Sequence, residues 1–214
     1  MYMHKFNALD TRNKNDIYVI KPGAVNVLFI GGCRSFAYSM FFEELCKHNS
    51  YLKNAQYGIG AVAVHIIELC KRNKTQNLTR VIEDADIIIC EQIRHYNILN
   101  TSNECEQNIF NNFNIKPTCK IINVPNLECY YENTPESKTQ NVSRLTEHCK
   151  KYNFEKLAKF IDENRDIIHL LFITVNHPST ALFCQLMKEL IETNFDVIID
   201  HELMSVMNRV RIFD

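Results

Sequence analysis

The chain lacks any long hydrophobic run, and it carries no excess of charge of either sign. Its longest apolar run, Ile167 to Val175, has the length of a strand, whereas a membrane-spanning helix needs about 20 apolar residues. The polar, charged N-terminus does not resemble a secretory signal. Lys and Arg number 24 against 25 Asp and Glu, a net charge of -1, so no overall field attracts nucleic acid or an anionic membrane. We therefore expect neither a membrane span nor a nucleic-acid partner.

The motifs of several common cofactor and metal sites are also missing. Gly31 and Gly32 do not belong to a Walker phosphate loop, and the third glycine of a dinucleotide-binding fingerprint is absent. No pair of histidines or cysteines has the spacing of a zinc site. His65 and His169 lie in apolar surroundings that are typical of core histidines. The sequence therefore predicts no bound metal.

Cysteine is not scarce, but its nine residues show no pairing pattern. Their odd number and the absence of a C-x-x-C motif argue against a disulfide framework. Several of them, including Cys70 and Cys90, lie within apolar runs. This pattern predicts free thiols in a reducing compartment, and we expect a cytoplasmic protein.

The overall composition is that of an ordinary globular domain. Hydrophobic residues make up 46% of the 214 residues and charged residues 23%, which is enough apolar side chain to bury a core. This length fits one domain, and no internal repeat or clear linker divides it. We predict a single α/β domain over residues 1–214 that begins with an irregular arm over residues 1–16.

The alternation of apolar runs and patterned segments predicts the fold class. Nearly continuous apolar residues from Val25 to Ile30, ended by glycine, predict a strand with both faces covered. The expected strands are residues 17–20 (at an edge), 25–30, 86–90, 119–124 and 167–175. The expected helices are residues 36–48, 57–74, 103–113, 144–164 (broken near 152–153) and 180–193. Residues 128–141 are expected to form a loop. The final stretch, residues 195–214, begins with Val197-Ile198-Ile199 and is expected to form a strand or a helix. This order indicates a mainly parallel central sheet flanked by helices, with helical additions.

Polar residues follow three of the predicted strands. These clusters are residues 31–35, 91–95 and 176–179. Ligands of open parallel sheets bind at the carboxyl ends of the strands. We therefore expect the three clusters to meet at one rim of the sheet.

The first cluster, Gly31-Gly32-Cys33-Arg34-Ser35, joins a strand to a helix. Two glycines let the backbone turn sharply and approach a ligand closely. The free N–H groups at the start of the helix, where Ser35 is a candidate N-cap, favour an anion. A thiol in this position has a lowered pKa, which makes Cys33 a candidate nucleophile or a residue lining an oxyanion site. The alternative is a tight turn with a buried, inert cysteine.

The other two clusters supply a candidate base and candidate ligand-binding groups. His177, which follows Asn176, is the candidate general base, because the proline after it favours an extended backbone facing the rim. Its alternative role is that of a surface or capping histidine. Gln92 could donate a hydrogen bond to an oxyanion, and Arg94 could bind a phosphate through two N–H groups. The alternative for both is a solvated helix start.

Together, the three clusters resemble the WcbI family of polysaccharide-biosynthesis proteins, which are regarded as acetyltransferases that bind coenzyme A. The family's first strand ends in Gly-Asn-Cys-Gln, where this chain has Gly31-Gly32-Cys33-Arg34. Its next block is a strand with a glutamine, here Gln92, and its last is Asn-His-Pro before a helix, here Asn176-His177-Pro178. The similarity extends over residues 25–192. Gly32 and Arg34 stand where the family has Asn and Gln.

This resemblance implies an acyltransferase that uses acetyl-coenzyme A to acetylate a sugar or a polysaccharide precursor. Cys33 would carry the acyl group or line the oxyanion site, and His177 would remove a proton from the acceptor or from Cys33. Gln92 and the backbone N–H groups of Gly32 and Cys33 would stabilise the tetrahedral intermediate. The residues that would hold coenzyme A are Gly31, Gly32, Arg34, Ser35, Arg94 and Asn176.

Two other functions stay open from the sequence. The order of the motifs also resembles SGNH-type hydrolases, so the same thiol and histidine would form an esterase with water as the acceptor. The third function is that of a non-catalytic α/β module that binds a nucleotide-like ligand or a partner protein. The sequence leaves the oligomeric state open as well.

Overall fold

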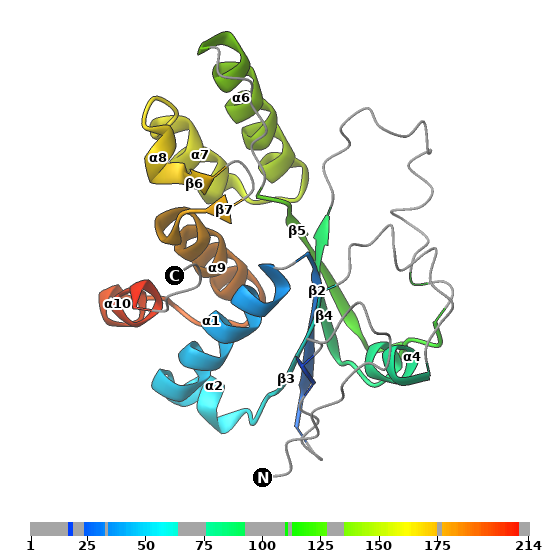
Figure 1. The fold of residues 1–214 in the computed structure, drawn as a ribbon. Helices are drawn as coiled ribbons and strands as arrows, with labels where there is room; N and C mark the ends of the chain where they lie inside the picture. The colour runs from blue at the N-terminus through cyan, green and yellow to red at the C-terminus, as the bar shows by residue number, and fades with distance from the viewer. Residues whose placement is uncertain are drawn as a thin grey trace. The chain divides into compact units, whose positions relative to one another are not determined.

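The structure is a computed structural model. It describes residues 17–18, 24–32, 34–63, 76–92, 110, 113–127, 135–174 and 177–209. It has the fold class that the sequence predicts, an α/β fold with a mainly parallel sheet flanked by helices (Figure 1). The chain divides into two compact units, residues 1–123 and residues 124–214, and each is described by itself. That they act as one domain stays a prediction, and the arm expected over residues 1–16 lies outside the described residues.

The central sheet has five described strands. Their order is β1 (Ile17–Tyr18), β3 (Gly58–Ala63), β2 (Asn26–Gly31), β4 (Ile87–Gln92) and β5 (Lys120–Pro125). β2 is parallel to both of its neighbours, β3 and β4, and β1 is antiparallel to β3. The Lys120 N–H donates to the carbonyl of Asp86 at 2.9 Å, so β4 and β5 begin at the same edge. The strands predicted over 25–30, 86–90 and 119–124 are thus confirmed, as is the edge strand at residues 17–18.

Both faces of β2 are covered. Alternate side chains of a strand point to opposite sides of the sheet, and a helix packs against each side. On one side Phe29 stacks on Tyr38 of α1 (Arg34–His48), with ring centroids 6.3 Å apart. On the other side Leu28 and Ile30 belong to a buried cluster that includes Val81 of α4 (Gln76–Glu83). α1 and α4 accordingly lie on opposite sides of the sheet in Figure 1. The apolar run is therefore a strand that lies between two layers of helices, as the sequence predicts.

The beginnings of β2 and β4 are joined by Asp86, the residue just before β4. One carboxylate oxygen of Asp86 accepts a hydrogen bond from the Asn26 N–H at 2.8 Å, and the other lies 2.7 Å from Nζ of Lys116. The same Lys116 ammonium donates to the carbonyl of Asp84 at 2.6 Å. Asp86 therefore fixes the register of the two strands at their amino ends.

The helix predicted over residues 57–74 is wrong in its first part, because Gly58–Ala63 forms β3. This segment pairs with β2 along one edge and with β1 along the other. Gly58 and Gly60 disfavour a helix, whereas the helical spacing of apolar residues begins only at Val62. Residues 64–74 lie outside the described part, as does nearly all of the helix predicted over 103–113. α2 (Ser50–Asn54) ends the connection from α1, with Asn49 Oδ1 accepting from the Leu52 N–H at 3.0 Å.

The second unit is mainly helical. Its elements are α6 (Pro135–Lys151), α7 (Glu155–Glu163), α8 (Ile168–Leu171), β6 (Phe172–Thr174), β7 (His177–Pro178), α9 (Thr180–Asn194) and α10 (His201–Asn208). The predicted break near 152–153 is confirmed as a turn in which Asn153 has a φ of 64°. The helix predicted over 180–193 is confirmed as α9. The loop predicted over 128–141 is wrong from Pro135 onward, where α6 begins. In the final stretch, for which a strand or a helix is predicted, residues 197–199 form neither, and His201–Asn208 forms the helix α10.

The strand predicted over residues 167–175 is also wrong for most of its length. Residues 168–171 form the short helix α8, and only Phe172–Thr174 is a strand. That strand, β6, pairs antiparallel with β7 in a separate two-stranded sheet. A short apolar run does not by itself distinguish a strand from a buried helix, and Pro178 in β7 has no N–H to extend the ladder.

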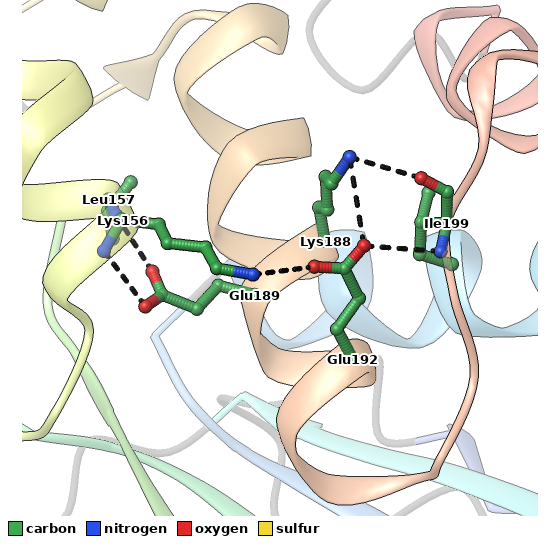
Figure 2. Close-up of polar contacts among 6 residues, drawn as sticks. All are labelled: Lys156, Leu157, Lys188, Glu189, Glu192 and Ile199. Atoms are coloured by element: carbon green, nitrogen blue, oxygen red, sulfur yellow. Dashed lines mark hydrogen bonds and ion pairs between the residues drawn. The ribbon is translucent and has the colours of Figure 1, made fainter.

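Acidic and basic side chains of α9 bind the start of α7 and the backbone at Ile199 (Figure 2). The buried carboxylate of Glu189 accepts hydrogen bonds from the N–H groups of Lys156 and Leu157 at 3.0 and 2.7 Å. Glu192 lies 3.0 Å from Nζ of Lys156 and also accepts from the Ile199 N–H at 3.3 Å. The N–H groups of the second and third residues of α7 are therefore satisfied by a side chain of α9 rather than by a local cap.

Among the described helices, none is long and apolar enough to cross a membrane.

Candidate functional site

The described residues of two predicted polar clusters, 31–32 with 34–35 and 91–92, meet at the carboxyl ends of β2 and β4. Ile30 and Cys90 are register partners in the parallel pair, which places Gly31 beside Glu91. Gly31 is the last residue of β2, and Glu91 and Gln92 are the last two residues of β4. The expectation that Gln92 follows its strand is therefore wrong, and so is the alternative of a solvated helix start at Gln92. The strand continues through Glu91 and Gln92, which are both buried.

Glu91 is the centre of this end of the sheet. Its Oε1 lies 2.7 Å from Nε of Arg34 and accepts a hydrogen bond from the Tyr38 hydroxyl at 3.3 Å. Its Oε2 accepts from the Gly32 N–H at 3.2 Å. The side chains of Arg34 and Glu91 are only 2% and 1% exposed. A buried carboxylate thus joins the end of β4 to the turn after β2 and to the first helical turn of α1.

Gly31 is required here for space. A Cβ at this position would lie 2.8 Å from Cβ and 2.9 Å from Oε2 of Glu91, closer than real Cβ contacts come. Any larger residue would displace the carboxylate that Gly32 and Arg34 bind. The sequence predicts that this glycine lets the backbone approach a ligand; in the structure the group that the backbone approaches is the side chain of Glu91.

Two further side chains of the predicted site are described at this end of the sheet. Ser35, in the first turn of α1, is fully buried, and its Oγ has no hydrogen-bond partner among the residues that the structure describes. Gln92 is 3% exposed and donates through Nε2 to Oδ1 of Asn123 on β5 at 2.8 Å. The Gly32 N–H, an expected oxyanion donor, is instead directed to Glu91.

His177 lies in the second unit, on β7, and is half-buried. It is register partner to Thr174, and the following Ser179 donates its N–H to the carbonyl of Leu171 at 2.8 Å. The Ser179 hydroxyl also accepts from the Leu182 N–H at 3.1 Å as the N-cap of α9. Because β6 and β7 form a separate two-stranded sheet, the prediction that His177 follows a strand of the central sheet is wrong, whereas its part in the site stays a prediction. His177 lies two residues before Ser179, and it is Ser179 that caps α9.

The remaining predicted site residues, Cys33, Arg94 and Asn176, lie outside the described residues. In the part of the chain that is described, no group of three or more His, Cys, Asp or Glu side chains could hold a metal ion. Sequence reasoning missed Glu91 and Tyr38 as members of the site. The signal for Glu91 was a charged residue at the end of an apolar run, since such a residue needs a buried partner when the strand continues.

The described cysteines are free, and burial makes several of them poor nucleophiles. Burial raises the pKa of Cys184 to about 12. Burial, together with the charge of Glu91, raises the pKa of Cys90 above its usual range. A thiol reacts only as the thiolate, so these two cysteines stay unreactive near neutral pH.

We expect the Cys184 thiol to make stability fall at alkaline pH. Its pKa is raised from 9.0 to about 12 in the folded chain, so between these values the unfolded chain has lost a proton that the folded chain retains. The contribution is complete below pH 9 and declines by about 1.4 kcal/mol per pH unit above it. Urea unfolding at pH 8 and pH 10.5 measures this when the protein is compared with Cys184→Ala. A stability difference that does not shrink at the higher pH would contradict the expectation.

Comparisons of the chain with protein-family models, with curated proteins and with solved structures found no match.

Proposed function

We propose that the protein is an acyltransferase that uses Cys33 as its nucleophile and acetyl-coenzyme A as its donor. The observation that carries this proposal is the turn after β2. It leaves the central parallel strand at its carboxyl end, where ligands of α/β folds bind. The buried carboxylate of Glu91 holds the residue before Cys33 through its N–H and the residue after it through its guanidinium. A turn fixed in this way suits a reacting group.

The proposed reaction has two steps. The Cys33 thiolate attacks the thioester carbonyl of acetyl-coenzyme A, the bond from the carbonyl carbon to the coenzyme sulfur breaks, and the coenzyme leaves as a thiol after taking up a proton. A sugar hydroxyl or amine then attacks the acetyl group on Cys33, gives up its proton to a base, and releases the Cys33 thiolate. We propose His177 as the base that exchanges these protons.

The charge on the carbonyl oxygen in both steps requires hydrogen-bond donors. The Ser35 hydroxyl is a candidate donor, because it has no partner among the described residues. The Ser35 N–H donates to the carbonyl of Gly32 at 3.0 Å, so the further candidates are the other N–H groups in the first turn of α1, since a helix N-terminus favours negative charge. Gln92, whose Nε2 donates to Asn123 at 2.8 Å, is the candidate donor that the sequence predicts. Loss of one such donor typically slows a reaction about 100-fold or more.

Mass spectrometry of the protein after incubation with acetyl-coenzyme A tests the proposal. We expect one acetyl group on the peptide that contains Cys33, and release of free coenzyme A thiol. Cys33→Ala should abolish both signals, whereas Cys46→Ala, which removes a half-buried cysteine of α1, should leave them unchanged. His177→Ala should slow acetylation about 100-fold or more if His177 is the base.

The outcomes separate the functions that the sequence leaves open. Steady release of coenzyme A without an acceptor would indicate hydrolysis rather than transfer. Acetylation that depends on Cys33 but not on His177 would retain the thiol chemistry and assign the base elsewhere. If neither acetyl transfer nor a thermal shift with coenzyme A is observed, the acyltransferase proposal is refuted.

A further inference from the structure

The last two residues of β4 place polar side chains on opposite sides of the central sheet, because successive side chains of a strand point to opposite faces. Glu91 lies on the side of α1, where it binds Arg34 and Tyr38. Gln92 lies on the side of α4, since Cys90, two residues before it, belongs to the buried cluster that α4 contacts. The carboxyl end of the strand thus presents a charged group to one side and an amide to the other.

The amide on the α4 side is connected to solvent through a second amide. Gln92 is 3% exposed, and its Nε2 donates to Oδ1 of Asn123 on β5 at 2.8 Å. Asn123 is exposed, although Ile122 and Val124 on either side of it are buried. Among the residues that the structure describes, this is the one hydrogen bond of the Asn123 side chain. A buried amide of β4 therefore holds an exposed amide near the carboxyl end of β5.

The bond from Gln92 determines which groups Asn123 presents to solvent. Oδ1 of Asn123 is the acceptor in this bond, so the amide directs Nδ2 and its two N–H donors away from Gln92. Water satisfies an exposed amide, and ordering its side chain costs conformational entropy. A ligand that binds to a side chain already held in place loses less of this entropy on binding. Gln92 thus pre-organises two donors at the end of the sheet where ligands of parallel sheets bind.

These donors suit an uncharged oxygen that only accepts hydrogen bonds. Strong binding of a phosphate uses cationic donors, and an amide N–H carries no charge. Recognition of an adenine edge needs both a donor and an acceptor from one amide, and Oδ1 of Asn123 is engaged by Gln92. A carbonyl oxygen needs donors alone. The pantetheine arm of coenzyme A carries amide carbonyls of this kind.

We propose that Asn123 binds an amide carbonyl of the pantetheine arm of acetyl-coenzyme A on the α4 side of the sheet, and that Gln92 is the positioning residue that orients it. The identity of the coenzyme rests on the proposed function. Gln92 acts on the ligand through Asn123, so the two residues contribute to affinity as one unit.

Isothermal titration calorimetry with coenzyme A tests the binding role of Asn123. Asn123→Ala removes the donors without changing the charge and should raise the Kd about 10-fold. Asn123→Asp keeps an acceptor for Gln92, so it should retain the unfolding temperature of the wild-type protein and lose at least as much affinity. Ile121→Asp is the control for charge, because it places a carboxylate at an exposed position of the same strand, two residues away, and keeps Asn123. It should weaken binding less than Asn123→Asp does.

Adenosine 3′,5′-bisphosphate, which lacks the pantetheine arm, is the second probe. It should bind Asn123→Ala as tightly as the wild-type protein. A loss of affinity for this probe equal to the loss for coenzyme A would place Asn123 against the nucleotide and overturn the proposal, as would an unchanged Kd for coenzyme A in Asn123→Ala.

A double-mutant cycle tests the positioning role of Gln92. Gln92→Leu leaves the donors of Asn123 unoriented and should raise the Kd for coenzyme A about threefold. Combined with Asn123→Ala, it should cause no further loss, because the two residues act as one unit. Additive losses would identify Gln92 as a direct donor and overturn the proposal. The variants at the exposed Asn123 decide the binding role even where Gln92→Leu does not fold.

Binding and acetyl transfer are measured separately, so the two proposals can fail separately. Acetylation of Cys33 together with an unchanged Kd in the Asn123 variants refutes the role of Asn123 alone. Binding that depends on Asn123 without acetylation refutes acyl transfer alone. If the wild-type protein does not bind coenzyme A, both are refuted.

Discussion

Replacing Glu91 with alanine is expected to lower the free energy of unfolding by about 3–5 kcal/mol. The Arg34 side chain is 2% exposed and binds Oε1 of Glu91 at 2.7 Å. The substitution therefore removes a carboxylate that balances a buried guanidinium charge. The Gly32 N–H and the Tyr38 hydroxyl also lose an acceptor. Because a folded domain is stable by only about 5–15 kcal/mol, this change removes a large part of the total. Urea unfolding followed by circular dichroism measures it.

The matched control is a surface ion pair with the same separation. Nζ of Lys47 lies 2.6 Å from Oε1 of Glu44, but these side chains are 54% and 33% exposed. Water screens this pair and solvates either partner when the other is removed, so Glu44→Ala should change stability by about 0.5 kcal/mol. Equal losses in Glu44→Ala and Glu91→Ala would mean that burial does not determine the strength of the Arg34 interaction.

The central sheet could be predicted because its strands carry strong and local signals. The run from Val25 to Ile30 is nearly continuous in apolar residues and ends at a glycine. A segment with the apolar spacing of an amphipathic helix follows it. Such a strand needs cover on both faces, and that requirement alone implies a layered α/β fold. In the structure Phe29 packs against α1 on one side of the sheet, and Leu28 packs into the cluster with α4 on the other.

Two elements could not be predicted, because apolar content does not determine which backbone forms. Gly58–Ala63 precedes a segment with helical spacing, and only its pairing with β1 and β2 identifies it as a strand. Residues 168–171 lie in the most apolar run of the chain yet form a helix. In both segments tertiary contacts decide between two conformations that the local sequence allows.

The candidate site was predictable only where chain topology determines it. Gly31 and Gln92 were expected near one another because parallel strands end at one edge, and the register of β2 with β4 confirms this. The ion pair of Arg34 and Glu91 joins residues 57 positions apart. No local sequence pattern predicts which basic side chain pairs with a buried carboxylate. The expectation that His177 follows a strand of the central sheet was wrong because it depended on the strand predicted over 167–175.

Replacing Glu189 with alanine is expected to lower the free energy of unfolding of the second unit by about 3 kcal/mol. Its carboxylate is buried and accepts from the N–H groups of Lys156 and Leu157 at 3.0 and 2.7 Å (Figure 2). A hydrogen bond to a charged group contributes about 1.5–3 kcal/mol, and Phe154, at the N-cap position of α7, supplies no side-chain cap of its own. The substitution therefore leaves two donors at the start of α7 without the acceptor that α9 provides. Hydrogen exchange of the Lys156 and Leu157 amides, together with urea unfolding, measures the change.

Glu163→Ala is the control on α7, the helix whose first turn Glu189 binds. Glu163 forms an ion pair with Lys159 at 3.6 Å, but both side chains are mostly exposed, so its loss should change stability by about 0.5 kcal/mol or less. Glu189→Gln separates the two contributions of the carboxylate, because it keeps one carbonyl oxygen as an acceptor and removes the charge that favours a helix N-terminus. We expect its loss to be smaller than that of Glu189→Ala, with exchange accelerated at one of the two amides. Unchanged exchange at both amides in Glu189→Ala would show that water replaces the carboxylate there, and that packing alone holds α7 against α9.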